Sequence, residues 1–399
     1  VGVELAMKLF VLISLVSFGV GGILLHRYLW QRESLWSLLG FQFLLGRSLL
    51  WGFLNFLFAA GLAMIILALW LSWRENRPRM AHLVLGLGAI AVYFSHFVGF
   101  GILAALVASV ALVDAYQSGI WHWRRFIALG GCFAIPLLLF VVTYFAQKTG
   151  TAGANTAAVT AIHFGNYWRK LDLPFSLFKA YSPILDGAAA LSFVGLIAYG
   201  IVRHRLALSP LILFPLGVLV VLYFVMPESI LSATLVDQRI PLFIVLVATA
   251  GTLPLMAYRG YAAVSLAAFA LLFGLRLAEV ATVWSQQDTE LREARMMIAS
   301  LPTGAKIATQ LGSSDRGLKR ENAPFDHLVT LAVIDRNALV GGLFSSPSQQ
   351  PLRYRQQMPE VATADYLLLL GTGGLPTSLR QFKPLRVSLK GTMKLYKIE

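Results

Sequence analysis

Long runs of apolar residues, separated by short polar stretches, fill the first 284 residues of the chain. A helix needs roughly 20 apolar residues to cross the hydrocarbon core of a bilayer, which is about 30 Å thick. We expect spanning helices at about 5–25, 50–72, 126–147, 186–203, 208–226, 240–257 and 261–283.

Two further apolar regions do not fit a single ordinary span. The run 81–114 would make about 51 Å of helix at 1.5 Å per residue, so we expect a hairpin of two short spans broken at Tyr93-Phe94-Ser95-His96. Residues 34–46 are too few for a span and predict a short or re-entrant helix. The predicted fold class is a polytopic α-helical membrane protein with about nine or ten transmembrane helices.

Polar residues become frequent after residue 284. Residues 286–399 hold 15 of the 33 Lys and Arg and 10 of the 19 Asp and Glu. Hydrophobic periodicity and turn residues predict a helix from about 286 to 301, strands at 306–309 and 366–370, a helix at 325–336 and a terminal strand pair around Gly391. We therefore expect a transmembrane domain, 1–284, and a small soluble α/β domain, 285–399.

The composition agrees with this division, since 57% of the residues are hydrophobic and only 13% are charged, against about 25% charged in soluble domains. The net charge of +14 is expected from loops that fix orientation and meet anionic headgroups. Membrane lipids are thus expected partners and nucleic acid is not. The single cysteine, Cys132, lies in an apolar run and excludes a disulfide framework or a thiol metal site.

The distribution of Lys and Arg favours one orientation. With ten crossings, the loops assigned to the inner side hold ten cations: Arg27, Arg32, Arg74, Arg77, Arg79, Arg124, Arg125, Arg203, Arg205 and Arg259. The outer side holds seven: Lys8, Arg47, Lys148, Arg169, Lys170, Lys179 and Arg239. Both chain ends then lie outside, which places the soluble domain there and suggests an upstream span that this sequence does not include.

The outer loop 148–186 is the first candidate site, because 39 residues exceed what a connector needs. Its second half places His163 and Trp168 next to Arg169 and Lys170. One interpretation is an interfacial belt of aromatic and basic residues. The other is a site for an anionic, ring-bearing ligand, with the cations on a phosphate and Trp168 stacked on a sugar.

Two more outer segments carry candidate residues. Asp237 and Arg239 lie where a span begins, either as a structural ion pair or with Arg239 positioned to bind a phosphate in its forked geometry. His96 lies at the tip of the 81–114 hairpin, either as a capping residue or as a member of the same outer site. The sequence contains no metalloprotease helix, phosphate-binding lysine loop, nucleophile elbow or helically spaced carboxylate pair. We assign no catalytic residue and no metal site, although a divalent metal cofactor stays open.

Four segments together resemble bacterial membrane glycosyltransferases of the GT-C type, relatives of the protein mannosyltransferase and aminoarabinose transferase enzymes. They are Trp51-Gly52-Phe53-Leu54-Asn55-Phe56-Leu57-Phe58-Ala59-Ala60-Gly61-Leu62-Ala63, the Tyr93-Phe94-Ser95-His96 tip, Asp237-Gln238-Arg239, and Leu301-Pro302-Thr303-Gly304-Ala305-Lys306. The resemblance implies an enzyme of the bacterial inner membrane that moves a sugar from a polyprenyl-phosphate donor to an acceptor on the periplasmic side.

The same resemblance implies an acidic general base in the first outer loop, and no segment here matches it. Either that loop lies upstream of residue 1 or the protein is not catalytic, so we assign no catalytic base. The resemblance also implies basic residues that stabilise the departing lipid phosphate. Arg239, Arg169 and Lys170 could fill this role. Two other classes remain open: a transporter or flippase of a lipid-linked substrate, and a non-catalytic membrane anchor for the C-terminal domain.

Overall fold

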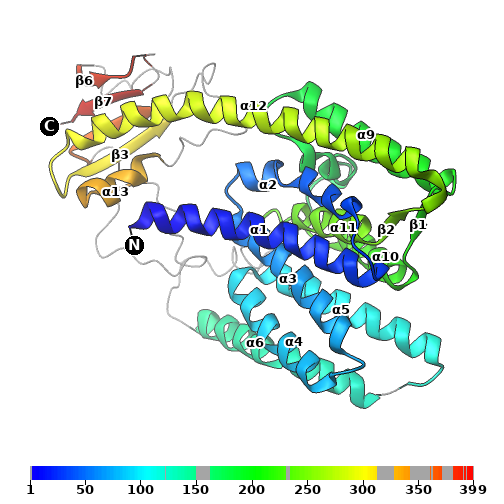
Figure 1. The fold of residues 1–399 in the computed structure, drawn as a ribbon. Helices are drawn as coiled ribbons and strands as arrows, with labels where there is room; N and C mark the ends of the chain where they lie inside the picture. The colour runs from blue at the N-terminus through cyan, green and yellow to red at the C-terminus, as the bar shows by residue number, and fades with distance from the viewer. Residues whose placement is uncertain are drawn as a thin grey trace. The chain divides into compact units, whose positions relative to one another are not determined.

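The computed structural model is mostly helical and divides into two compact units, Val1–Leu277 and Ala278–Glu399. It describes residues 2–121, 123–149, 162–230, 234–311, 328–341, 360, 363–370, 381–389, 391 and 393–398. Figure 1 shows the order of the elements along the chain. The boundary at Leu277 falls inside the last apolar helix, earlier than the expected boundary at 284.

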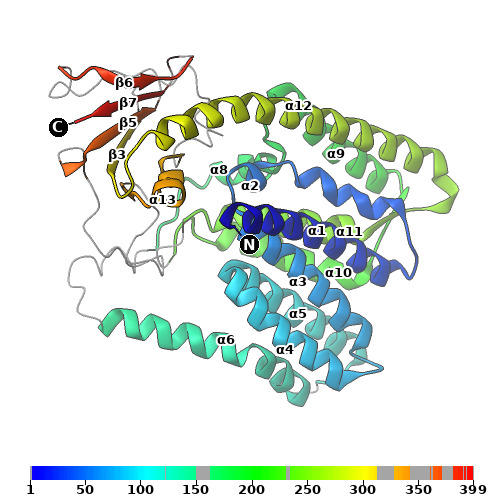
Figure 2. The same ribbon diagram turned by 60° about the vertical axis from the view of Figure 1, so that its left-hand side comes forward.

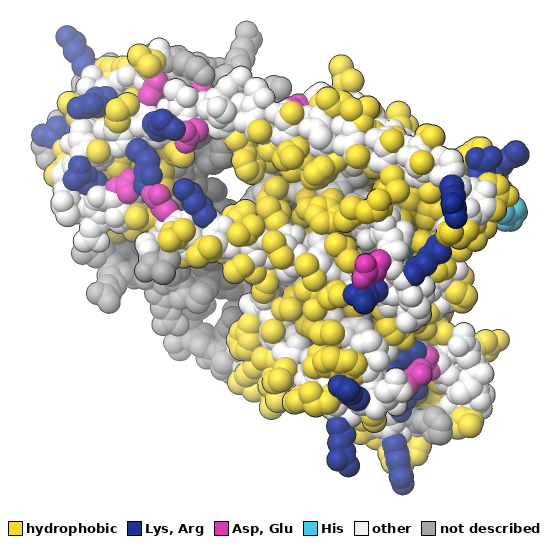
Figure 3. Space-filling model, viewed as in Figure 1, with side chains coloured by type: hydrophobic (Ala, Val, Ile, Leu, Met, Phe, Trp, Pro, Cys, Tyr) yellow, Lys and Arg dark blue, Asp and Glu magenta, His cyan; other side chains and the backbone are white. Residues whose placement is uncertain are grey.

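Seven helices among the described residues are long and apolar enough to cross a membrane. They are α1 (Val3–Trp30), α3 (Leu54–Trp73), α4 (Pro78–Ser95), α5 (Phe97–Ser118), α6 (Trp123–Thr149) over its first 21 residues, α9 (Pro183–Val202) and α12 (Arg259–Ala299). Their length and composition suggest a membrane-embedded protein. On the face drawn in Figure 3, hydrophobic side chains cover most of the helical surface of the first unit, as lipid contact requires.

The expected hairpin within 81–114 is confirmed, because α4 ends at Ser95 and α5 begins at Phe97. The expectation of nine or ten spanning helices is only partly met. Residues 35–43 form a largely buried 3-10 helix, η1 (Leu35–Phe43), which leads into the single turn α2 (Arg47–Leu50).

Two other expected spans are shorter than predicted. The helix α10 (Pro210–Val225) has 16 residues and α11 (Ile240–Ala250) has 11, or about 24 and 16 Å at 1.5 Å per residue. The run 240–257 ends early because Gly251 stops α11 and the next residues form a strand, β2 (Thr252–Pro254). This strand pairs antiparallel with β1 (Leu206–Leu208). Hydropathy alone does not distinguish a buried strand from the end of a helix.

The closest packing in the first unit joins α1 to α3, which lie side by side in Figures 1 and 2. Gly61 of α3 faces the backbone of Ser17 and Phe18, and Gly21 of α1 faces the carbonyl of Gly61, with no room for a Cβ at either glycine. Small residues of this kind let helix backbones touch, which is how packing energy is gained when lipid surrounds the helices.

A fully buried cation, Arg276, ties separate segments of the first unit together. Its guanidinium donates to the carbonyls of Gln42 (2.9 Å) and Phe178 (2.5 Å), and its Nε lies 3.4 Å from Asp186 Oδ1. Gln42 belongs to η1, Phe178 to the 3-10 helix η2 (Leu173–Phe178), and Asp186 to α9. Arg276 therefore fixes two short helices that have too few residues to be stable alone.

The second unit is the α/β domain that the sequence predicts. Its five-stranded sheet has the order β4-β3-β5-β7-β6, with bounds Lys306–Leu311 (β3), Leu339–Val340 (β4), Tyr366–Leu370 (β5), Pro384–Val387 (β6) and Met393–Lys397 (β7). The strands β3, β4 and β5 are parallel, and β7 is antiparallel to both β5 and β6.

One face of this sheet packs against helices. Ala294 and Met297 of α12 share a core with Leu368 of β5, Leu395 of β7 and Ala332 of the short helix α13 (Leu331–Arg336). The expected helix at 325–336 is described only from Leu328, where a 3-10 turn, Leu328–Thr330, leads into α13. The separate helix expected from 286 is wrong, because α12 continues unbroken from Arg259 to Ala299, with no proline along its length.

Candidate functional site

Three segments of the first unit that are far apart in sequence meet near the α4–α5 turn: the start of α3, the turn itself and the loop between α10 and α11. The ring of Phe56 on α3 lies 5.2 Å from the ring of His96, and the Arg239 guanidinium lies 5.4 Å from the ring of Phe53. The loop between α10 and α11 carries Arg239 in the 3-10 turn η3 (Asp237–Arg239). The structure thus places His96 and Arg239 around the same pair of phenylalanines.

His96 caps the start of α5 and is neutral at pH 7. Its Nδ1 accepts a hydrogen bond from the backbone N–H of Val98 at 3.2 Å, which leaves the ring proton on Nε2. Burial, and to a smaller extent the charge of Arg239, lower the pKa of His96 to about 4. The capping interpretation of His96 is therefore confirmed, and Nε2–H remains a donor close to Arg239.

Arg239 is a half-buried cation whose donors are only partly used. Its Nη1 donates to the carbonyl of Thr234 at 2.9 Å, whereas its buried Nε has no hydrogen-bond partner among the described residues. Burial lowers the pKa of the guanidinium and the charge of Asp237 raises it, but a guanidinium stays protonated at any physiological pH. Within the described part of the chain, no carboxylate lies at ion-pair distance from Arg239, so the alternative of a structural pair with Asp237 is not realised.

Asp237 lies buried on the other side of the same turn, and its Oδ1 has no hydrogen-bond partner among the described residues. Burial raises the pKa of this carboxyl, the charge of Lys170 lowers it, and the charge of Glu228 raises it. Two residues upstream, Leu235 adopts a left-handed φ of 58°. A leucine in this region costs roughly 1 to 2 kcal/mol, and such strain is found preferentially at functional sites.

Lys170 differs from its expected role in phosphate binding. It belongs to the single turn α8 (Arg169–Asp172), is 4% exposed, and donates through Nζ to the carbonyls of Tyr223 (3.0 Å), Phe224 (2.9 Å) and Met226 (2.5 Å). These carbonyls end α10, where a cation offsets the negative end of the helix dipole. All three ammonium donors are used, so Lys170 anchors its loop to α10.

The remaining candidates lie on the outside of the same two loops. Arg169 Nη1 lies 3.7 Å from Glu228 Oε1, and the backbones of His163 and Ser229 form a two-bonded antiparallel bridge. Trp168 is 76% exposed. The loops 162–182 and 226–239 are therefore in contact, which agrees with the expectation that both lie on one face. Residues 150–161 of the first loop lie outside the described residues.

Arg47, Trp51 and Phe53 form a cation–aromatic cluster beside Arg239. The sequence pattern did not predict that these residues belong to the site. The Arg47 guanidinium lies 3.6 Å from the ring centre of Trp51, and that ring lies 6.0 Å from Phe53. Gly52 between them has a φ of 73°, a left-handed turn that lets the two flanking rings approach each other. The sequence signal for this cluster is the triplet Trp51-Gly52-Phe53 at the start of a span. This triplet contributes only to the family resemblance.

Comparison of the chain with protein-family models, curated proteins and solved structures finds no match. Among the described residues, no group of three or more His, Cys, Asp or Glu side chains is placed to hold a metal ion. What the cluster offers is a guanidinium, a neutral imidazole donor and aromatic rings, which is a set suited to an anion attached to an apolar or ring-bearing group.

Proposed function

We propose that this chain is the membrane body of a glycosyltransferase, and that Arg239 binds the phosphate of a polyprenyl-phosphate sugar donor. The observation that carries the proposal is the half-buried Arg239 guanidinium, which has an unused buried Nε and no carboxylate partner among the described residues. A cation in this state gains most from an anionic ligand, because a phosphate supplies both the missing charge and the missing acceptors.

The surroundings of Arg239 support a phosphate on a lipid carrier. The neutral imidazole of His96 adds a hydrogen-bond donor. Phe53 and Trp51 offer apolar and aromatic surface next to the guanidinium, and rings of this kind can pack against sugars and isoprenoid chains.

In the proposed reaction, the bond between the sugar anomeric carbon and the phosphate oxygen breaks, and the same carbon bonds to a hydroxyl oxygen of the acceptor. Negative charge grows on the departing lipid phosphate, and a fixed guanidinium stabilises it more in the transition state than in the bound donor. The acceptor hydroxyl loses its proton to a carboxylate general base, the kind of group that the family resemblance implies. On the periplasmic side of a bacterial inner membrane, lipid-linked sugars are the donors available for such transfer.

The first test measures binding of polyprenyl phosphate and of the matching polyprenyl alcohol to the full chain in detergent. The wild-type protein should prefer the phosphate. Arg239→Ala should reduce that preference by about 10- to 100-fold, the value of a charge-assisted hydrogen bond, and Arg239→Lys should restore part of it. Arg203→Ala, an exposed arginine after α9, is the control and should bind as the wild type does. Unchanged phosphate preference in Arg239→Ala would show that the site is assigned wrongly.

The second test follows label from polyprenyl-phosphate-linked tritiated hexoses into lipid or polymer acceptors in reconstituted membranes. Transfer that is lost in Arg239→Ala and kept in Arg203→Ala supports the enzyme. Movement of the intact donor between leaflets without transfer would indicate a carrier. Phosphate preference with neither activity would leave the chain as a non-catalytic anchor for its C-terminal domain.

A further inference from the structure

A second cluster of charges lies at the far end of α5 from His96. His96 precedes the first residue of this helix, and Asp114 lies in its last two turns. The helix has 22 residues, so its two ends are separated by about 33 Å, the thickness of the hydrocarbon core. A helix that carries the candidate site at one membrane boundary therefore places Asp114 at the opposite boundary.

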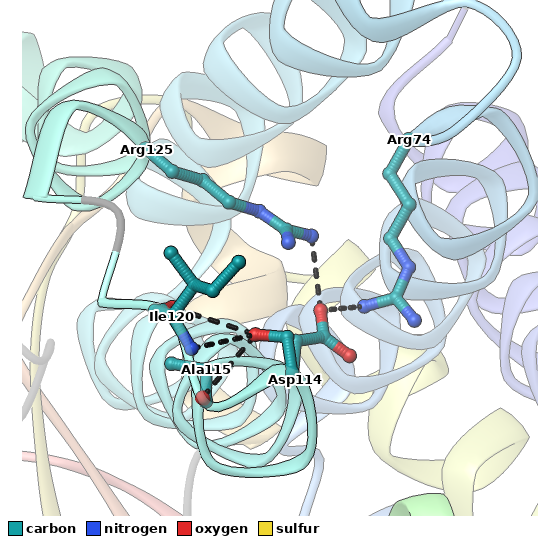
Figure 4. A network of polar contacts seen from close by, with 6 residues as sticks. Arg74, Asp114, Ala115, Ile120 and Arg125 are labelled. Carbon is teal, nitrogen blue, oxygen red and sulfur yellow. Dashed lines mark hydrogen bonds and ion pairs between the residues drawn. The ribbon is translucent and has the colours of Figure 1, made fainter.

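Asp114 holds two turns of the chain together at this end (Figure 4). Its Oδ2 accepts from Arg74 Nη1 at 2.6 Å and from Arg125 Nη2 at 2.9 Å. Arg74 follows the last residue of α3, and Arg125 lies in the first turn of α6. One carboxylate thus fixes the ends of three helices and leaves the pair of guanidinium groups with a surplus of positive charge.

More cations surround this fixed centre. Arg77 is the N-cap of α4, Arg79 lies in the first turn of α4, Arg124 lies at the start of α6, and all three are exposed. Within the described residues, none of the three has a carboxylate at ion-pair distance. In Figure 3, several Lys and Arg side chains project from this end of the first unit, next to a hydrophobic surface.

Exposed aromatic rings accompany these arginines. Trp121 is 66% exposed and Trp123 is 58% exposed. The Arg124 guanidinium lies 5.5 Å from the Trp123 ring, and Trp121 is stacked on Phe126 at 4.9 Å. Tryptophan rings favour the headgroup level of a bilayer, where the apolar ring and the polar N–H are both satisfied. Their presence distinguishes this surface from a cationic surface exposed to water.

We propose that this rim, made of Arg77, Arg79, Arg124, Trp121 and Trp123, binds the headgroups of anionic phospholipids in the surrounding bilayer. The three guanidinium groups contact the phosphates and the two indoles lie at the level of the glycerol. The Arg74–Asp114–Arg125 contacts hold the α3–α4 and α5–α6 turns in register, so the rim is formed before lipid binds. This inference does not depend on the proposed function.

The test reconstitutes the full chain in vesicles of equimolar phosphatidylcholine and phosphatidylglycerol and measures by native mass spectrometry which lipid stays bound after extraction. The wild-type protein should retain phosphatidylglycerol preferentially. Each arginine replaced in Arg77→Gln/Arg79→Gln/Arg124→Gln should lower that preference about fivefold, the contribution of one basic side chain near an anionic surface. The corresponding triple replacement by lysine should keep it, because the charge is retained.

The matched control removes three cations from the second unit in Lys383→Gln/Arg386→Gln/Lys394→Gln, and it should retain phosphatidylglycerol as the wild type does. Equal retention of both lipids by the wild type would overturn the proposal. So would an equal loss of preference in the control, which would mean that net charge alone decides retention. If an excess of inorganic phosphate abolished the preference, the rim would be a free-anion site, and the assignment to lipid headgroups would be wrong.

Discussion

Lys170 and Tyr223 hold each other by reciprocal contacts to the main chain. Lys170 Nζ donates to the Tyr223 carbonyl at 3.0 Å, and Tyr223 Oη donates to the Lys170 carbonyl at 2.5 Å. The two residues thereby fix α8 to the end of α10. The loop that begins after α10, residues 226–239, carries both Asp237 and Arg239. The Lys170–Tyr223 contacts therefore fix the position of the first residues of the loop that carries the candidate site.

Replacing Lys170 should therefore affect stability before it affects ligand binding. Lys170→Met leaves three carbonyls, one buried and two partly buried, without this donor, and we expect a loss of about 2 to 4 kcal/mol in the free energy of unfolding. Thermal unfolding in detergent measures the effect. Lys179→Met, in the same loop, should unfold close to the wild-type temperature. If Lys170→Met were as stable as the wild type but bound polyprenyl phosphate poorly, Lys170 would be a ligand rather than an anchor.

His96 predicts how stability depends on pH. Burial lowers its pKa to about 4 in the folded chain, below the value near 6.5 of an unfolded histidine. The unfolded chain then binds more protons between these values, so the free energy of unfolding should fall by up to about 3 kcal/mol as the pH drops from 6.5 to 4.

The variant His96→Asn isolates this effect, because asparagine also caps a helix but does not titrate. Denaturant unfolding of both proteins between pH 4 and pH 7.5 provides the comparison. The wild type should lose stability toward low pH more steeply than His96→Asn. Parallel curves would mean that His96 is more accessible to protons than its burial indicates.

The contact between α1 and α3 predicts a strong dependence on side-chain size at one glycine. A Cβ at position 61 would overlap the backbone of Ser17 and Phe18, which cannot move aside as a side chain can, so Gly61→Ala should cost about 3 kcal/mol. Gly22→Ala provides the control on the facing helix, because a Cβ added there would meet no heavy atom within 4 Å. That change should be neutral or stabilise by up to about 1 kcal/mol. Equal thermal stabilities of the two variants would contradict the packing.

The contact between Arg276 and Asp186 predicts that the effects of replacing the two residues on stability are not additive. Arg276→Met removes the donor shared by Gln42 and Phe178 and leaves Asp186 as a buried carboxylate, which should cost about 3 to 5 kcal/mol. Adding Asp186→Asn removes that charge and should restore part of the loss. A double variant as unstable as the sum of both single variants would show that the two side chains act independently.

The elements with a clear periodic signal could be predicted from the sequence. The α4–α5 hairpin follows from a run too long for one span, and the strands β3, β5 and β7 from short apolar segments between polar turns. The shortness of α10 and α11 could not be predicted, because a strand such as β2 is as apolar as a helix end. Where a hydrophobic run stops being helical depends on its tertiary partners.

For single residues of the candidate site, too, the sequence does not reveal the tertiary partners. The sequence indicates that His96, Lys170 and Arg239 belong to neighbouring loops, but it does not show which cation is already satisfied. Lys170 and Arg239 look equivalent as outer basic residues, yet one faces three carbonyls and the other keeps an unused Nε. The role of Arg276 is missed because its partners, the carbonyls of Gln42 and Phe178 and the carboxylate of Asp186, come from segments far away in the sequence.

The short strand pair β1–β2 has a mechanical consequence. Because Leu206 pairs with Pro254 and Leu208 with Thr252, the chain is clasped just before α10 and just after α11. The two helices therefore leave and return at one point, and α11, most of whose residues are buried, runs directly from that point to its N-cap Arg239. The strand pair thereby sets the position from which the helix that carries Arg239 is anchored.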